Sequence, residues 1–229
     1  FRLIIRFRMC KLFQILEVGQ IGTVVVCCRP EGFGKSMNLS MLRAFLERPA
    51  VGRSSQRLFA DAQIWDADGG RYRDEYACYP VISLDFSGAT RRGAAIAGVV
   101  RDALSGECAR LLAFLEAPDL ARDKVRHIER VARGAASADE VASVLGVLIE
   151  LLEIASDEQV VLLVDGYDAA WSRRASARDA SDADPAELLD RVLFDAIATA
   201  RDSLRLTCLM GGVPVLQQRR FLRAAARIV

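Results

Sequence analysis

The sequence predicts an α/β protein, a three-layer sandwich in which helices cover both faces of a mainly parallel sheet. Two observations support this prediction. Apolar runs of strand length alternate along the chain with longer stretches whose apolar residues recur every three or four positions. The runs TVVVCC and VVLLVD are apolar on both faces, which is typical of parallel strands buried between two helical layers.

The elements follow in order along the chain. Four strands are expected, at residues 23–28, 81–86, 160–165 and 204–212. Residues 52–79 have no clear period and are expected to form an excursion with short helical pieces, and 172–185 a polar loop. Helical periodicity predicts a last helix after Pro214 and earlier helices at 11–18, 37–46, 92–116, 120–134, 138–155 and 186–202.

The composition limits the class of protein. Of the 229 residues, 52% are hydrophobic and 27% charged, which excludes disorder as the main state. The 31 basic and 30 acidic residues leave a net charge of +1, so no field of one sign attracts nucleic acid or a membrane surface. No apolar run approaches the roughly 18 residues of a membrane span. We therefore expect a cytoplasmic protein whose anion sites are local.

Both ends of the sequence look like cut ends. The first residue is Phe1, and the last ten residues carry an amphipathic pattern without a stop signal. We therefore expect residues 1–229 to be a single domain taken from a longer chain.

Cysteine and histidine usage argues against several kinds of site. The six cysteines contain no C-x-x-C pair, which disfavours a zinc site and a disulfide scaffold. The single histidine, His127, lies in the charged stretch DKVRHIERVAR, where we expect a solvated helix face rather than a catalytic base. Cys27 and Cys28 are expected to point to opposite faces of one strand as small buried side chains.

The segment GFGKS, residues 32–36, lies between an apolar strand and a helix, which is the context that a phosphate-binding loop requires. Backbone N–H groups of Gly32, Phe33 and Gly34 would face a phosphate at the helix N-terminus. Lys35, one of three lysines beside twenty-eight arginines, would reach the β- and γ-phosphates, and the Ser36 hydroxyl would bind Mg²⁺. A strand–helix turn that holds Lys and Ser by chance stays open.

Asp165 ends the most hydrophobic strand, VVLLVD, and is the candidate second ligand of Mg²⁺. A strand-end cap is the alternative for this residue. Asp85, at the end of VISLDF, is expected to cap the following turn, with a second-sphere role toward Mg²⁺ as the alternative. Thr207 is expected to be an ordinary strand residue rather than a γ-phosphate sensor.

Four segments together resemble the AAA-ATPase-like family of the P-loop NTPase superfamily. They are CRPEGFGKSMNLSMLRAFLE, YPVISLDFSG, VVLLVDGYD and LMGGVP, in the family's order over roughly residues 10–216. The resemblance implies a P-loop NTPase fold that binds ATP with Mg²⁺, and it explains Arg29 where the strict phosphate-loop pattern has glycine. Gly34, Lys35 and Ser36 match the phosphate and magnesium positions, and Asp165 matches the metal-holding acid.

Two departures from the family pattern predict weak hydrolysis. Glu31 and Gly32 replace two arginines of the phosphate loop, and Gly166 replaces the glutamate expected to position the attacking water. A general base typically contributes 10²- to 10⁴-fold, so its loss would spare binding and slow turnover. We therefore assign no catalytic residue. A glutamate placed at position 166 is expected to fold at small cost unless the backbone there has a positive φ.

The sequence is compatible with several other interpretations. Glu31, Asp85 or Asp168 are candidate substitutes for the missing glutamate, and Tyr167 and Asp168 match the tail of the acidic motif. The chain could instead be a non-catalytic scaffold or protein-interaction module derived from an ATPase domain. A small-molecule kinase with Arg173, Arg174 and Arg178 in a lid is a third, weaker reading. A protein partner or a homo-oligomer is compatible with each.

Overall fold

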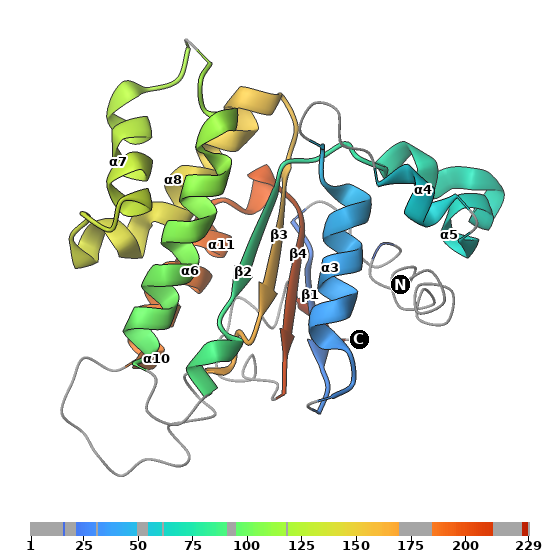
Figure 1. Cartoon of the computed structure of the whole chain (residues 1–229), viewed down its shortest axis with the longest axis horizontal. Helices are drawn as coiled ribbons and strands as arrows, with labels where there is room; N and C mark the ends of the chain where they lie inside the picture. The colour runs from blue at the N-terminus through green and yellow to red at the C-terminus, as the bar shows by residue number, and fades with distance from the viewer. Residues whose placement is uncertain are drawn as a thin grey trace.

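The computed structural model describes residues 22–30, 32–49, 55–60, 62–90, 95–117, 119–169, 185–212 and 226–228, together with residue 16. Its centre is a five-stranded sheet with the strand order β2-β3-β4-β1-β5, in which every pair of neighbours is parallel. Helices lie on both faces of the sheet (Figure 1), so the predicted three-layer α/β sandwich is confirmed. The strands are β1 (Val24–Cys28), β2 (Val81–Asp85), β3 (Val160–Asp165), β4 (Leu204–Gly211) and β5 (Ala226–Ile228).

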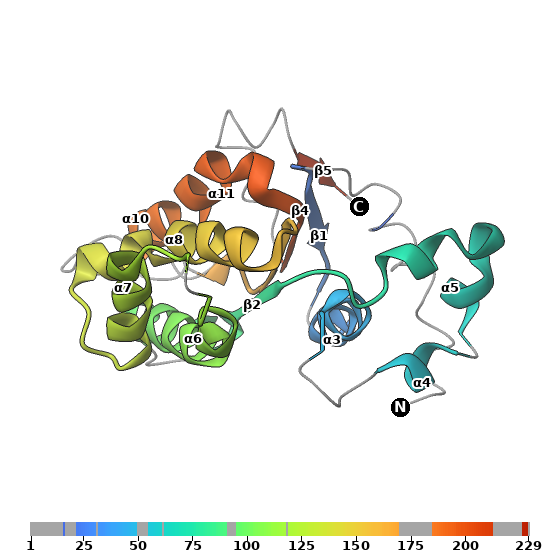
Figure 2. The ribbon, with the colours of Figure 1, turned by 90° about the horizontal axis from the view of Figure 1, so that it is seen from above.

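The helices form two groups, one on each side of the sheet when it is seen from above (Figure 2). One group is α3 (Lys35–Leu46) with the short α4 (Gln56–Phe59), α5 (Gln63–Asp66) and η1 (Ala67–Glu75). The other group lies across the sheet and consists of α6 (Ile96–Leu111), α7 (Arg122–Ala132), α8 (Ala138–Ser156), α10 (Pro185–Leu189) and α11 (Asp195–Thr199). The described residues also contain short helical turns, η2 (Ser87–Thr90), η3 (Leu112–Phe114), η4 (Asp190–Phe194) and η5 (Arg201–Ser203).

The four predicted strands are confirmed to within one residue at each end. The predicted helix at 186–202 is confirmed over residues 185–199, where α10, η4 and α11 follow one another without a break and η4 is a π-helical turn, and residues 201–203 form the short η5. The prediction of a helix at the end of the chain is wrong for residues 226–228, which form β5 and pair with β1. Pairing there satisfies backbone groups on an otherwise open edge of β1. Residues 213–225 and most of the predicted helix at 11–18 lie outside the described residues.

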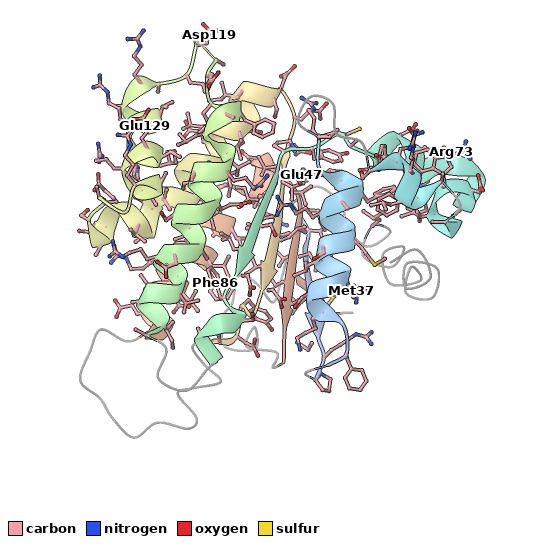
Figure 3. The ribbon with its side chains drawn as sticks, in the orientation of Figure 1. Met37, Glu47, Arg73, Phe86, Asp119 and Glu129 are labelled. Atoms are coloured by element: carbon pink, nitrogen blue, oxygen red, sulfur yellow. The ribbon has the colours of Figure 1, made fainter. Side chains whose placement is uncertain are left out.

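Alternation along each strand divides the core between the two faces. From β2, Ile82 and Leu84 join a large cluster under α6 and α8, and Val81 joins a smaller cluster under α3. Cys27 and Cys28 are divided between the two faces, as predicted, although Cys28 is half-buried rather than buried. Figure 3 shows the side chains of both layers, with Phe86 labelled at the end of β2, where it is fully buried.

The excursion between α3 and β2 contains short helices, as predicted, and packs on the outer side of α3 through aromatic rings. The ring centroids of Phe45 and Phe59 are 5.2 Å apart, and those of Phe45 and Tyr76 are 5.5 Å apart, both in edge-to-face arrangement. Ser55 Oγ donates a hydrogen bond of 2.6 Å to the Ala44 carbonyl. These contacts fix the excursion beside α3.

Because all strands are parallel, their carboxyl ends meet at one edge of the sheet, where ligands of open α/β sheets bind. The register pairs Cys28 with Gly211, Asp165 with Met210, and Asp85 with Asp165. The segment that contains GFGKS starts from this edge. The fold therefore brings the predicted loop and the strand-end acids to one place.

Candidate functional site

The loop between β1 and α3 ends in a left-handed glycine. Gly34 is the N-cap of α3 and has a φ of 73°, and Gly32 has a φ of 79°. A residue with a Cβ rarely adopts this backbone, which explains the two glycines around Phe33. Gly34 offers no side chain to cap the helix, so the first N–H groups of α3 face the loop. The first turn of α3 is therefore suited to an anion.

Lys35 lies over this loop. Its ammonium group donates hydrogen bonds of 2.9 Å to the Arg29 carbonyl and 3.0 Å to the Pro30 carbonyl. The cation is thus held at the loop rather than extended into solvent. Phe33, by contrast, points away from the protein, with 57% of its surface exposed.

Ser36 and Asp165, 129 residues apart in sequence, meet at the N-terminus of α3. The Ser36 hydroxyl donates a short hydrogen bond to Asp165 Oδ2. Asp165 is only 5% exposed, and this burial raises the pKa of its carboxyl group. The hydrogen bond from Ser36 and the charge of Lys35 lower that pKa, whereas the charge of Asp85 raises it further. The pair supplies one hydroxyl and one carboxylate oxygen, which are hard ligands that suit Mg²⁺.

Asp85 lies on the neighbouring strand, directly opposite Asp165 in the register. Its Oδ1 accepts a hydrogen bond of 2.8 Å from the backbone N–H of Ser87, which confirms the predicted cap of the turn after β2. Asp85 also lines the same cleft as Ser36 and Asp165. Asp85 therefore caps the turn and also lies beside the Ser36–Asp165 pair.

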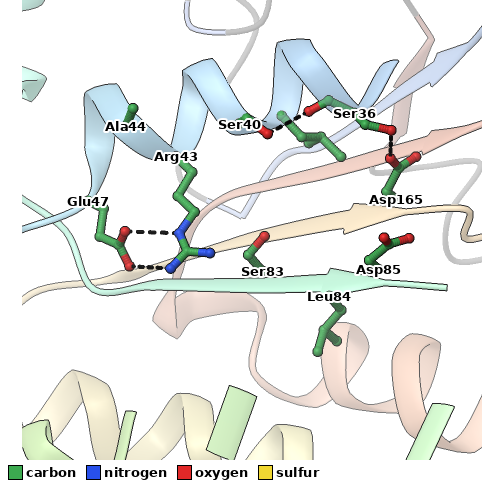
Figure 4. A pocket seen from close by; sticks show the side chains of 10 residues that line it. Ser36, Ser40, Arg43, Ala44, Glu47, Ser83, Leu84, Asp85 and Asp165 are labelled. Carbon is green, nitrogen blue, oxygen red and sulfur yellow. Dashed lines mark hydrogen bonds and ion pairs between the residues drawn. The ribbon is translucent and has the colours of Figure 1, made fainter. Parts of the chain in front are cut away.

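The cleft, about 340 Å³ in volume, runs along α3 beside the edge strand β2 (Figure 4). The Ser36–Asp165 pair lies at one end, and the ion pair of Arg43 with Glu47 (2.9 Å) lies at the other. The residues that line the cleft are not predicted from the sequence as one site. Residues spaced by four along α3 or by two along β2 are nevertheless expected to share a face. The lining residues are Ser36, Leu39, Ser40, Arg43, Ala44, Glu47, Ser83, Leu84, Asp85 and Asp165.

Gly166 follows Asp165 with a φ of 68°. A Cβ at this position would lie 2.6 Å from the backbone nitrogen of Ser87 and 2.9 Å from the carbonyl carbon of Phe86. The turn after β2 thus packs directly against Gly166. The exception expected for a positive φ therefore applies, and a glutamate here would fold at a large cost, because its backbone would be strained and its Cβ would collide with main chain.

The tail of the acidic motif turns toward β4. Asp168 is buried, and its Oδ2 accepts a hydrogen bond of 2.8 Å from the N–H of Gly212. The hydroxyl group of Tyr167 lies 3.5 Å from Cys28 Sγ. These contacts tie the motif to the ends of β4 and β1, away from the cleft that Asp85 lines.

Thr207 lies in the middle of β4, in register with Val24 and Leu162. It precedes Met210, the partner of Asp165, by three residues, or about 10 Å along a strand. This depth supports the prediction of an ordinary strand residue rather than a phosphate sensor.

His127 is half-buried rather than on a solvated face. Its Nε2 lies 2.8 Å from the Glu140 carbonyl, and because a carbonyl only accepts, Nε2 is the donor that links α7 to α8. Glu31 and the arginines 173, 174 and 178 lie outside the described residues. None of the helices in the described ranges has the length and apolarity needed to cross a membrane.

A comparison with curated proteins found no match. A family model described as a predicted AAA-ATPase matches residues 11–220, which include the loop, both strand-end acids and β4. That match covers most of the 229 residues, so the chain belongs to the AAA-ATPase-like family.

Proposed function

We propose that this protein binds ATP together with Mg²⁺ at the loop of residues 32–36, and that it hydrolyses ATP slowly. The observation that supports this proposal is the contact between Ser36 and Asp165 at the open N-terminus of α3. A chance strand–helix turn gives no reason for a buried acid from a distant strand to meet the serine that follows the lysine.

Each residue has a distinct role in this proposal. Backbone N–H groups of Gly32, Phe33 and Gly34 would hold phosphate oxygens, and the Lys35 ammonium would leave its two carbonyl acceptors for the β- and γ-phosphates. Ser36 and Asp165 would hold Mg²⁺, whose charge would offset that of the triphosphate. A cation beside Asp165 would also favour its ionised form, which burial alone disfavours.

Slow hydrolysis follows from position 166. The residue there is a glycine with a positive φ, packed against the turn after β2, so it supplies no carboxylate for the attacking water. A well-placed general base contributes about 10²- to 10⁴-fold in rate, so turnover without the carboxylate of residue 166 is expected to be slow, while the phosphate contacts stay in place.

Titration with a fluorescent ATP analogue, with and without Mg²⁺, tests the proposal. Lys35→Ala is expected to weaken binding at least tenfold, or about 1.4 kcal/mol, without changing the thermal melt. Lys124→Ala is the matched control, because it removes the same charge from an ion pair with Glu150 on the far layer. Equal affinity of wild type and Lys35→Ala contradicts the proposal, and a folded wild-type protein that binds no analogue favours the scaffold alternative.

A further inference from the structure

Position 166 has no carboxylate, but the carboxylate of Asp85 lies at the same edge of the sheet. Asp85 is paired in register with Asp165, and both line the cleft that begins at Ser36. Figure 4 shows the two carboxylates side by side at this end of the cleft. We propose that Asp85 orients and deprotonates the water that attacks the γ-phosphate, a role that rests on the proposed ATP site.

Gly166 and Asp85 belong to one local arrangement. The turn that Asp85 caps is the segment that packs against Gly166, since Ser87 N lies 2.6 Å from the position of a Cβ there. The backbone after β2 therefore occupies the space in which the side chain of residue 166 would begin. The same turn carries the carboxylate of Asp85, so the absence of one acid and the presence of the other have a common structural cause.

The hydrogen bonding of Asp85 suits a group that holds water. Oδ1 is fixed by the N–H of Ser87, and within the described residues Oδ2 makes no hydrogen bond. The side chain is exposed at the mouth of the cleft, so water reaches it. Asp165, by contrast, is buried and bonded to Ser36. Asp165 is thus suited to hold the metal ion, and Asp85 is suited to act as a base that faces solvent.

Asp168 is the rival candidate within the described residues, and its contacts favour a structural role. It is only 5% exposed, and its Oδ2 is bonded to the N–H of Gly212 at the end of β4. It does not line the cleft that Ser36, Asp85 and Asp165 share. A water held by Asp168 would have to lie on a different side of the strand ends.

The proposed step balances as follows. The water oxygen bonds to the γ-phosphorus, and the bond from that phosphorus to the bridging oxygen breaks, so ADP leaves with the electron pair. One proton of the water passes to the Asp85 carboxylate and from there to solvent at the exposed end of the cleft. The products are ADP and inorganic phosphate.

Asp85→Asn is the discriminating variant, because an amide oxygen still accepts the N–H of Ser87 but cannot take a proton. Phosphate release is expected to fall by about 10²-fold or to the Lys35→Ala background. Affinity for the ATP analogue is expected to stay within about twofold, since the phosphate contacts remain. Binding of ADP with aluminium fluoride, which mimics the phosphoryl group with water in line, is expected to weaken without any turnover being measured.

Controls and outcomes separate this proposal from the binding proposal. Asp102→Asn, on the exposed side of α6, removes the same charge and is expected to change neither readout. The role of Asp85 is overturned if Asp85→Asn releases phosphate at the wild-type rate. It is also overturned if saturating Mg²⁺ restores phosphate release by this variant. Two further results overturn it: phosphate release that falls in Asp168→Asn but not in Asp85→Asn, and a wild-type protein that binds the analogue but releases no phosphate. The ATP site itself is contradicted by different results, namely a wild-type protein that does not bind the analogue or equal affinities of wild type and Lys35→Ala.

Discussion

The two faces of the sheet differ in how completely helices cover them. Under α6 and α8 the apolar cluster is continuous and includes residues from the strands, both long helices, η4 and α11. Under α3 the cluster is smaller, and beside it lies the cleft of about 340 Å³. Strand β2 contributes Ile82 and Leu84 to the first face and Ser83 and Asp85 to the second. Alternation along one strand therefore separates the stabilising face from the face with the candidate chemistry.

The edge of β2 shows how the two faces are joined. Glu107 Oε1 accepts a hydrogen bond of 2.6 Å from the N–H of Ser83, and Arg110 donates one of 2.5 Å to the Val81 carbonyl. Arg110 also forms an ion pair of 2.5 Å with Glu47, the C-cap residue of α3. Side chains from α6 thus pair the outward backbone groups of β2 and reach across to the other layer. This arrangement blocks pairing with a further strand at that edge.

The largest expected effect on stability comes from the covered face. Leu145 of α8 is fully buried, so Leu145→Ala is expected to lower the free energy of unfolding by about 2–5 kcal/mol through lost burial and a cavity. Affinity of the remaining folded protein for an ATP analogue is expected to be unchanged. Urea unfolding followed by circular dichroism measures the first quantity, and titration below the transition measures the second.

Ile154 of the same helix is 55% exposed and provides the control. Ile154→Ala is expected to change stability by no more than about 0.5 kcal/mol. If Leu145→Ala instead weakens nucleotide binding at constant stability, the two faces are not functionally separate.

The second effect tests the tight contact at the end of β3. Gly166→Ala is expected to destabilise the protein by about 1–3 kcal/mol from the left-handed backbone alone, with the collision against Ser87 added to this. Gly166→Glu is expected to destabilise at least as much and to produce no gain in phosphate release. Thermal melts and phosphate-release assays measure both. A well-folded Gly166→Glu protein with faster phosphate release would contradict this account.

Residues 165 and 166 show where sequence reasoning succeeds and where it ends. An apolar run that ends in an acid predicts both β3 and the place of Asp165, because burial and strand ends leave direct patterns. The close packing of the turn after β2 against Gly166 leaves no pattern, since the two segments are distant in sequence. The same reason hides the pairing of Asp85 with Asp165 and the walls of the cleft. The strand β5 was missed because pairing with β1 is a long-range effect that local periodicity does not carry.

The third effect is smaller and concerns the charge of Asp165. Because burial raises the pKa of this carboxyl group in the folded protein, folded molecules hold its proton more tightly than unfolded ones do. Its contribution to stability is therefore greatest at low pH and falls as the pH rises from about 3.8 through the raised value. Asp165→Asn removes this penalty, so its melting temperature without Mg²⁺ is expected to exceed that of wild type at pH 7.

Mg²⁺ is expected to reverse that order. With the ATP analogue present, Mg²⁺ should raise the melting temperature of wild type and have little effect on Asp165→Asn, because an amide is a poorer ligand for a hard cation. Melts with and without Mg²⁺ measure this difference. An equal response of both proteins to Mg²⁺ would return Asp165 to the role of a strand-end cap.

The smallest effect comes from Glu140, on the covered side, and it has the opposite sign to that of Asp165. The N–H of Ser137 and the guanidinium of Arg130 lower the pKa of Glu140 from 4.5 to about 2. A depressed carboxyl pKa contributes stability that is present above about 4.5 and lost as the pH falls toward 2. In Glu140→Gln the amide oxygen still accepts the Ser137 N–H but loses the charge facing Arg130. Its melting temperature is expected to lie slightly below wild type at pH 7 and to match it near pH 2.

Glu129→Gln, which breaks an exposed pair with Arg133, is the control and is expected to leave the profile unchanged. A pH series of melts on wild type, Glu140→Gln and Asp165→Asn would then show acid lability arising from the α7–α8 hairpin and acid tolerance arising from the cleft. If Glu140→Gln kept the full acid loss of wild type, the carboxylates of the two faces would not have the opposite effects that their surroundings predict.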